Sequence, residues 1–221
     1  MTEPIWLRHN MVSLALHPLP PLDADPVEGA ATLLLLHGLG EASPPVRPDW
    51  AASWPGPVYA LDFTGHGRST VPHGGGYSAE LLMADADAAL AAVGPATIVG
   101  RGLGAYVALL VAGARPKLVR GAILGDGPGL AGGGVGPTSG SVLVAERRDG
   151  APDPWALGEL THDVRPPDYA TSFARLALQF SGVSWPFAVC ARWRPPWLEA
   201  VASEPGVLDV SLDEAITFYR T

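Results

Sequence analysis

The stretch that decides the fold is residues 97–104, which read Thr97-Ile98-Val99-Gly100-Arg101-Gly102-Leu103-Gly104. An apolar run enters a turn flanked by glycines, and a second apolar run over 103–113 has the length of a helix. The pattern predicts a strand, a tight turn and a helix. In a G-x-S-x-G turn of this kind, a serine side chain stands exposed above a sheet. Here the middle position is Gly102, which has no side chain and therefore supplies no nucleophile.

Other short apolar runs, bounded by glycine and proline, lie on both sides of this turn. Continuous apolar runs are typical of strands that are buried on both faces of a parallel sheet. The runs cover residues 32–36, 58–61, 96–99, 121–124, 187–191 and 207–210. Residues 11–16 alternate weakly between apolar and polar and are a candidate for a first strand.

Helical patterns fall between these runs. Ser78 is a suitable cap for a helix over 79–93, and Gly94-Pro95 is a suitable end for it. A second helix is expected to be capped by Asp168, and a short one is expected around 197–201. The apolar residues of the second helix recur on one face, namely Tyr169, Phe173, Leu176 and Phe180. The alternation predicts an α/β fold with a mostly parallel central sheet flanked by helices.

We expect one domain over residues 1–221. Residues 129–184 interrupt the alternation and open on a glycine-rich stretch over 132–137. We interpret this region as a small helical insertion or reduced cap over the carboxyl ends of the strands, where ligands bind in such sheets. Within it, residues 141–145 are a candidate for a further strand.

Composition and charge exclude several classes of protein. Hydrophobic residues make up 48% of the chain and charged residues 16%, which indicates a globular protein. The net charge is −8 without a dense basic cluster, which argues against binding nucleic acid. The apolar stretch over 103–114 is too short for a membrane span of about 20 residues. No signal-peptide pattern opens the chain, so we expect a cytoplasmic protein that binds no membrane.

The histidines and the single cysteine form no metal-binding pattern. No two histidines have a zinc-like spacing such as H-x₃-H, so we expect no metal ion, and no motif indicates a cofactor. Cys190 is the one cysteine, and it lies in an apolar run where we expect a buried structural thiol.

Three ordered motifs resemble those of the α/β-hydrolase superfamily. Residues 34–40 look like the strand and H-G-x-G turn of that family, and residues 62–69 are similar to its D-x-x-G-H-G-x-S loop. The turn at Gly102 resembles its nucleophile elbow. The resemblance implies the α/β-hydrolase fold, with an oxyanion hole formed by the backbone N–H groups of Leu39 and Leu103.

The side chains of the family's catalytic triad are missing from their expected places. Gly102 stands at the nucleophile position, and no histidine follows His162, although the family's histidine comes after the last strand. The family's acid near the end of the penultimate strand is also missing, because residues 191–194 read Ala191-Arg192-Trp193-Arg194. Asp126 alone matches, at an alternative acid position. Hydrolysis by a Ser-His-Asp triad is therefore not expected.

Several residues remain candidates for a site. The candidate catalytic side chains are Asp126 and His162, and the latter lies in the insertion. Arg101 is expected to make a surface or loop contact, and the alternative is that it binds an anionic group. The turn and elbow supply the candidate binding elements, which are His37, Gly38, Leu39, Arg101, Gly102 and Leu103. His37 and His66 are expected to bond loop backbone, as is usual in the family. Four tryptophans are candidates for an apolar wall or for core packing, namely Trp155, Trp185, Trp193 and Trp197.

These observations leave three functions open. The favoured one is a non-catalytic or weakly active hydrolase-like protein that binds a small, largely apolar molecule. The second is a hydrolase or lyase with non-standard residues, in which Asp126, His162 and the oxyanion-hole amides act together. The third is an interaction protein whose pocket is vestigial. The oligomeric state is not predicted.

Overall fold

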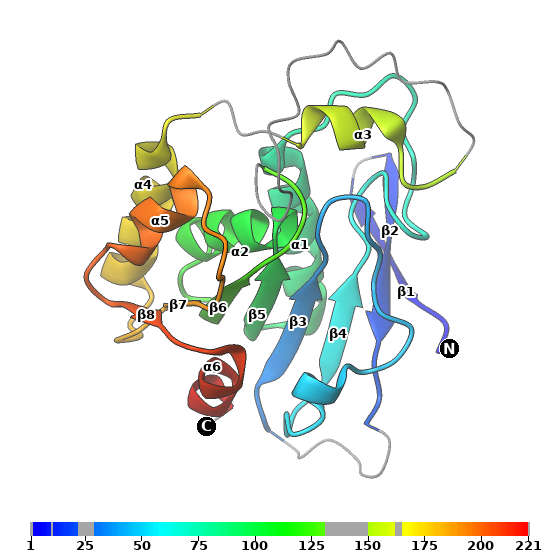
Figure 1. The fold of residues 1–221 in the computed structure, drawn as a ribbon. Coiled ribbons are helices and arrows are strands. Elements are labelled where there is room, and N and C mark those ends of the chain that lie inside the picture. The colour runs from blue at the N-terminus through cyan, green and yellow to red at the C-terminus, as the bar shows by residue number, and fades with distance from the viewer. Residues whose placement is uncertain (1, 10, 22–28, 131–149, 162–164, 221) are drawn as a thin grey trace.

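A computed structural model describes residues 2–9, 11–21, 29–130, 150–161 and 165–220. Its eight strands form one sheet in the order β1-β2-β4-β3-β5-β6-β7-β8 (Figure 1). The β1–β2 and β2–β4 pairs are antiparallel, and all other neighbours are parallel. The strands are β1 (Ile5–His9), β2 (Val12–Pro18), β3 (Thr32–Leu36), β4 (Val58–Leu61), β5 (Ala96–Arg101), β6 (Val119–Gly125), β7 (Phe187–Val189) and β8 (Val207–Asp209).

Helices cover both faces of this sheet. They are the 3-10 helix η1 (Asp49–Ala51) and the α-helices α1 (Ala79–Val93), α2 (Leu103–Ala114), α3 (Pro154–Glu159), α4 (Pro167–Phe180), α5 (Pro196–Ala202) and α6 (Leu212–Tyr219). One apolar core joins α1, α2, α4 and α5 to one face, and a second joins η1 and α6 to the other. The predicted α/β fold with a mostly parallel, helix-flanked sheet is confirmed.

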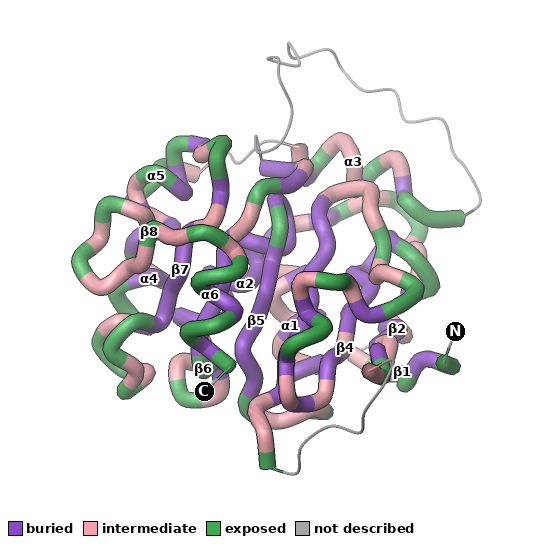
Figure 2. Tube along the Cα trace, turned by 60° about the horizontal axis from the view of Figure 1, so that its bottom comes forward, coloured by how far each residue is buried: buried purple, intermediate pink, exposed green. Residues whose placement is uncertain are grey.

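The middle of the sheet is buried, as the continuous apolar runs predict (Figure 2). Every residue of β3 is buried, and in β5 only Arg101 is exposed. The predicted bounds of β3, β4 and α1 are confirmed. The Ser78 side chain caps α1 by accepting a hydrogen bond from the Leu81 N–H at 3.2 Å. None of the described helices is long and apolar enough to cross a membrane.

The sequence pattern misplaces some elements. Strand β1 was not predicted, because it lies at the edge of the sheet with residues that are exposed or half-buried, and so has no continuous apolar run. The candidate strand over 11–16 is observed as β2, from Val12 to Pro18. Strands β7 and β8 are shorter than the runs that predict them.

The predicted face of α4 is correct only in part, and its predicted cap is wrong. Tyr169 and Phe173 are partly buried and pack against the core. Small residues form the buried face, namely Ala170, Thr171, Ala174 and Ala177. Leu176 and Phe180 are 41% and 51% exposed. Small residues are needed because α4 approaches α2 closely: a Cβ on Gly113 would lie 2.6 Å from the Phe173 carbonyl oxygen. Pro166 is the cap residue of α4, and Asp168 lies in its first turn.

The region over 129–184 contains α3 and α4. Helix α3 lies above the carboxyl ends of the strands, whereas α4 belongs to the helical layer on one face of the sheet (Figure 1). The candidate strand over 141–145 and the candidate catalytic residue His162 lie outside the described residues.

Candidate functional site

The elbow between β5 and α2 has the predicted strand-turn-helix form. Gly102 is its turn residue, with φ 54° and ψ −116°, a backbone conformation that residues with a side chain rarely adopt. Gly100 and Gly104 allow a close approach on either side, because a Cβ on Gly104 would lie 2.3 Å from the Leu36 carbonyl oxygen. The elbow therefore sits tightly against the carboxyl end of β3.

The two amides that the resemblance assigns to an oxyanion hole come together at this elbow. The Leu39 N–H comes from the loop after β3, and the Leu103 N–H comes from the first turn of α2. Both donate hydrogen bonds of 2.9 Å to the same atom, the carbonyl oxygen of Pro128. Two convergent donors are the arrangement that holds an oxyanion during acyl transfer. Here the oxygen that they hold belongs to the chain itself.

Pro128 lies in a short segment that begins at the last residue of β6, residues 125–130, which we call the plug. A Cβ on Gly102 would lie 2.3 Å from both the Gly127 carbonyl carbon and the Pro128 carbonyl oxygen. A Cβ on Gly38 would lie 2.6 Å from Cδ of the Pro128 ring. The plug thus fills the space that a serine side chain at position 102 would need.

Asp126 belongs to the plug and is exposed. Its carboxylate accepts two backbone hydrogen bonds of 2.8 Å each, from the N–H groups of Arg192 and Trp193 in the turn after β7. The predicted catalytic acid therefore lies beside Gly102, and it connects the plug to this neighbouring turn.

Arg101 connects the elbow to two other segments. Its Nε donates to the Asp126 carbonyl oxygen at 3.2 Å, and its Nη2 lies 3.3 Å from Oε1 of Glu41. The other oxygen of Glu41 accepts the Gly38 N–H at 2.9 Å. Glu41 was not identified from the sequence, although it directly follows the H-G-x-G turn. The Arg101 guanidinium, a candidate for binding an anionic group, is thus bonded to groups of the chain itself.

The His37 side chain is buried and bonded to backbone on both sides of its ring. Its Nε2 accepts the Phe63 N–H at 3.1 Å, so its Nδ1 carries the proton and donates to the Gly38 carbonyl oxygen at 2.7 Å. Burial, together with the neighbouring His66, lowers the pKa of His37 to about 4. A neutral imidazole fixed in this way shapes the turn that presents Leu39.

An ion pair stands between the strand ends from which the family's acid and histidine project. Arg194, in the turn after β7, pairs with Asp209 at the end of β8. The next residues, Val210 and Ser211, lead into α6, and Ser211 caps that helix with Glu214 in a reciprocal capping box. The loop after β8 therefore contributes a helix cap in this region.

A small hollow remains beside the elbow. Its lining consists of Gly102, Gly125, Asp126, Gly127, Trp193, Pro195, Trp197 and Leu198. About 10 Å³ is open to the centre of a water molecule, which is room for about one water. Trp193 is exposed and Trp197 is buried. Trp155 and Trp185, which the sequence placed in the same candidate wall, do not line it.

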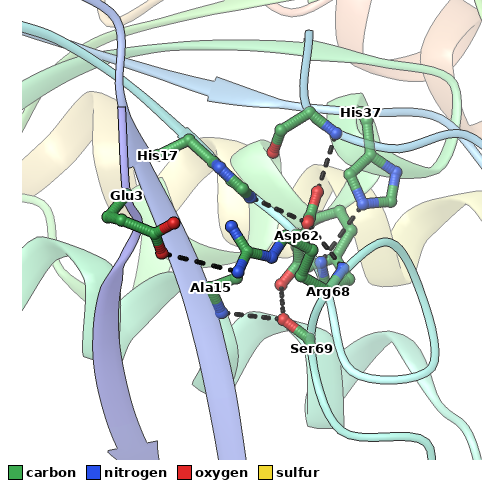
Figure 3. Close-up of polar contacts among 9 residues, drawn as sticks. Glu3, Ala15, His17, His37, Asp62, Arg68 and Ser69 are labelled. Atoms are coloured by element: carbon green, nitrogen blue, oxygen red, sulfur yellow. Dashed lines mark hydrogen bonds and ion pairs between the residues drawn. The ribbon is translucent and has the colours of Figure 1, made fainter. Parts of the chain in front are cut away.

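The loop over 62–69 is built around a buried carboxylate (Figure 3). Asp62 accepts the Ser43 N–H at 2.7 Å, the Arg68 N–H at 2.8 Å and a hydrogen bond from His17 Nε2 at 2.9 Å. Burial acts to raise the pKa of Asp62, but the backbone hydrogen bonds from Arg68 and Ser43 outweigh it and the pKa is lowered. Ser69 bonds loop and strand backbone. This cluster ties the loop to β2.

Within the part of the chain that the structure describes, no group of three or more His, Cys, Asp or Glu side chains could hold a metal ion.

The sheet, the glycine elbow and the pair of convergent amides define an α/β-hydrolase fold. A family model described as "Alpha/beta hydrolase family" matches residues 33–214, which is most of the chain. The chain belongs to this family.

This chain is also similar to several solved structures. A hydrolase from Pseudomonas aeruginosa is 26% identical, with a TM-score of 0.46, over 57% of this chain and 46% of that chain. Epoxide hydrolase A from Mycobacterium thermoresistibile is 23% identical, with a TM-score of 0.47, over 58% of this chain and 40% of that chain. A bacterial membrane phospholipase A is 17% identical, with a TM-score of 0.53, over 98% of this chain and 84% of that chain.

The chain spans less than half the length of the Pseudomonas aeruginosa hydrolase, of epoxide hydrolase A and of other solved structures that it matches. No curated protein is similar enough to count as a match.

Proposed function

We propose that this protein is a non-catalytic member of the α/β-hydrolase family whose oxyanion hole is occupied by its own backbone. The observation that carries the proposal is the Pro128 carbonyl oxygen, which accepts both the Leu39 and Leu103 N–H groups at 2.9 Å. A substrate carbonyl would need the same two donors, so it would have to displace the plug before it could bind there.

The chemistry of the elbow supports the same conclusion. Gly102 supplies no nucleophile, and no histidine follows the last strand to act as its base. In a serine protease, loss of such residues lowers turnover by a factor of about 10⁶. In an enzyme with an intact triad, loss of a single oxyanion-hole donor by itself lowers kcat by a factor of about 10² to 10³. With these deficits together, we expect no hydrolysis above background.

The sequence suggests a small, largely apolar ligand, and the hollow that the described residues form beside the elbow offers it little room. The hollow is walled by Trp193, Trp197 and Leu198, but it admits a group of about the size of one water. A ligand there is limited to a single small group unless the plug moves. Asp126, proposed for an unusual enzyme, already holds two backbone amides.

An oxyanion hole that the chain itself fills favours a second candidate, an interaction protein that uses the fold as a scaffold. The oligomeric state of the purified protein tests this candidate. Analytical ultracentrifugation across a range of concentrations measures it. Self-association would favour this candidate. A monomer that binds a small apolar probe at the hollow would favour the ligand-binding form of the proposal.

The activity experiment compares the natural chain with Gly102→Ser on a panel of p-nitrophenyl esters of increasing acyl length. Neither protein is expected to exceed the uncatalysed rate, because serine at 102 would collide with the plug and would have no base. Gly94→Ser is the matched control, since Gly94 also has a positive φ, of 78°, but open space around its Cβ. Ester turnover by the natural chain would overturn the proposal, and so would a large gain confined to Gly102→Ser.

A further inference from the structure

The amino-acid composition of the plug does not by itself hold this segment in one conformation. Gly125, Gly127 and Gly129 are three of its six residues, and glycine leaves the backbone free to adopt many conformations. A segment of this kind stays in one place only if contacts from outside hold it. The structure provides such contacts at both ends of the plug.

We infer that Arg101 and Glu41 act as a latch that keeps the Pro128 carbonyl in the oxyanion hole. This regulation of the site rests on the proposed function. Arg101 donates from Nε to the Asp126 carbonyl oxygen, two residues before Pro128. Glu41 orients the guanidinium at 3.3 Å and at the same time accepts the Gly38 N–H. The latch thus joins the plug to the turn that presents Leu39.

The Asp126 side chain holds the same end of the plug from the opposite side. Its two carboxylate oxygens accept the Arg192 and Trp193 N–H groups at 2.8 Å. Hydrogen bonds to a charged acceptor are stronger than those between neutral groups. The Asp126 residue is therefore held through its carbonyl by Arg101 and through its carboxylate by the turn after β7.

The far end of the plug is fixed at Leu130. Its N–H donates to the Leu160 carbonyl oxygen at 2.8 Å, and its carbonyl oxygen accepts from Trp197 Nε1 at 3.4 Å. Leu130 is buried and has a φ of 47°, which is unfavourable for a residue with a side chain. Such a backbone persists only where the surroundings impose it, so the closed position is imposed from outside the plug.

The test is hydrogen exchange of individual amides, measured by NMR on the ¹⁵N-labelled full chain. Exchange of the Leu39 and Leu103 N–H groups reports release of the Pro128 carbonyl. Arg101→Gln and Glu41→Gln each break an exposed ion pair, whose typical strength predicts about twofold to fivefold faster exchange at these two amides. Asp126→Asn removes a charged acceptor of two amides, and we expect about tenfold faster exchange.

The reference amide is Gly65, which bonds the Thr70 carbonyl oxygen at 2.9 Å in another loop and should not change. Arg175→Gln is the matched control variant, because it breaks the ion pair between Arg175 on α4 and Glu204 after α5 and should leave Leu39 and Leu103 unaffected. Equal acceleration at Gly65, or no acceleration at Leu39 and Leu103, would overturn the latch. Ester hydrolysis by the natural chain would overturn the proposed function instead, and the exchange measurement does not depend on it.

Discussion

A side chain at position 102 would collide with the backbone of the plug. This steric contact constrains the site more than the lack of a serine hydroxyl group does. The ideal Cβ position lies 2.3 Å from two backbone atoms of the plug. Backbone atoms cannot rotate away as the end of a flexible side chain can. Gly102 is therefore required by the present packing, whatever the chemistry of the residue it replaces.

Substitution of this residue should cost stability in two separable parts. Gly102→Ala and Gly94→Ala both place a side chain on a backbone with positive φ, which costs about 1–3 kcal/mol. Gly102→Ala should cost about 1–3 kcal/mol more, because it also overpacks against the plug. Urea unfolding of both variants measures the difference in the free energy of unfolding. Equal losses would mean that the plug does not press on Gly102.

The Pro128 ring has a smaller role than its carbonyl group. Pro128→Ala keeps the backbone oxygen that Leu39 and Leu103 hold, and it removes ring atoms that pack against Gly38. We expect a stability loss of about 1 kcal/mol, of the size of one buried methylene group, and unchanged protection of the two amides from hydrogen exchange. Rapid exchange of both amides in this variant would show that the ring, rather than the carbonyl, closes the site.

At the scale of elements, the order of strands brings the site together. The carboxyl ends of β3, β5 and β6 lie side by side in a parallel sheet, so the loops after them meet at one edge. The loop after β3 supplies Leu39, the turn after β5 supplies Leu103, and the plug follows β6. Sequence motifs identify the loop after β3 and the turn after β5. The plug has no such motif, because its glycines indicate only a turn.

Helix α4 shows how packing overrides the apolar pattern. Its close approach to α2 selects small buried residues, so Ala174→Leu should destabilise the protein by about 1–3 kcal/mol through overpacking. Leu176→Ala, on the exposed side of the same helix, should change stability by less than about 0.5 kcal/mol. Thermal unfolding of the two variants provides the check. A larger loss for Leu176→Ala would restore the face that the sequence pattern favours.

At the scale of the whole molecule, two buried carboxylates set opposite responses to pH. Asp62 has a lowered pKa, so its stabilising contribution is present at neutral pH and is lost as the pH falls below about 4. Asp85 on α1 is fully buried and accepts the Thr64 N–H at 2.8 Å, with His9 Nδ1 at 3.9 Å. Burial raises the pKa of Asp85 to about 6 against the opposing Thr64 hydrogen bond.

The folded protein therefore binds a proton at Asp85 more tightly than the unfolded chain does, so the contribution of this group to stability is lost as the pH rises from about 4 to 6. Buried His37 acts in the opposite direction over the same range, because its pKa is lowered from 6.5 to about 4 and the unfolded chain binds that proton more tightly. Asp85→Asn removes the first effect and keeps an amide oxygen that accepts the Thr64 N–H, so its free energy of unfolding should rise more steeply between pH 4 and 6 than that of the natural chain. Chemical unfolding of both proteins at a series of pH values measures the difference. The same pH profile in both proteins would show that Asp85 does not contribute to it.

The sequence by itself determined the parallel part of the sheet, because continuous apolar runs between glycine and proline are sufficient to specify buried parallel strands. It also determined the elbow at Gly102, the turn with His37 and Gly38, and the missing triad side chains, since each of these depends on residues close together in the chain. Tertiary structure alone decided what fills the site. The contact between Pro128 and the amides of Leu39 and Leu103 joins three loops, and it is made by a backbone carbonyl, a group that every residue carries and no sequence pattern distinguishes.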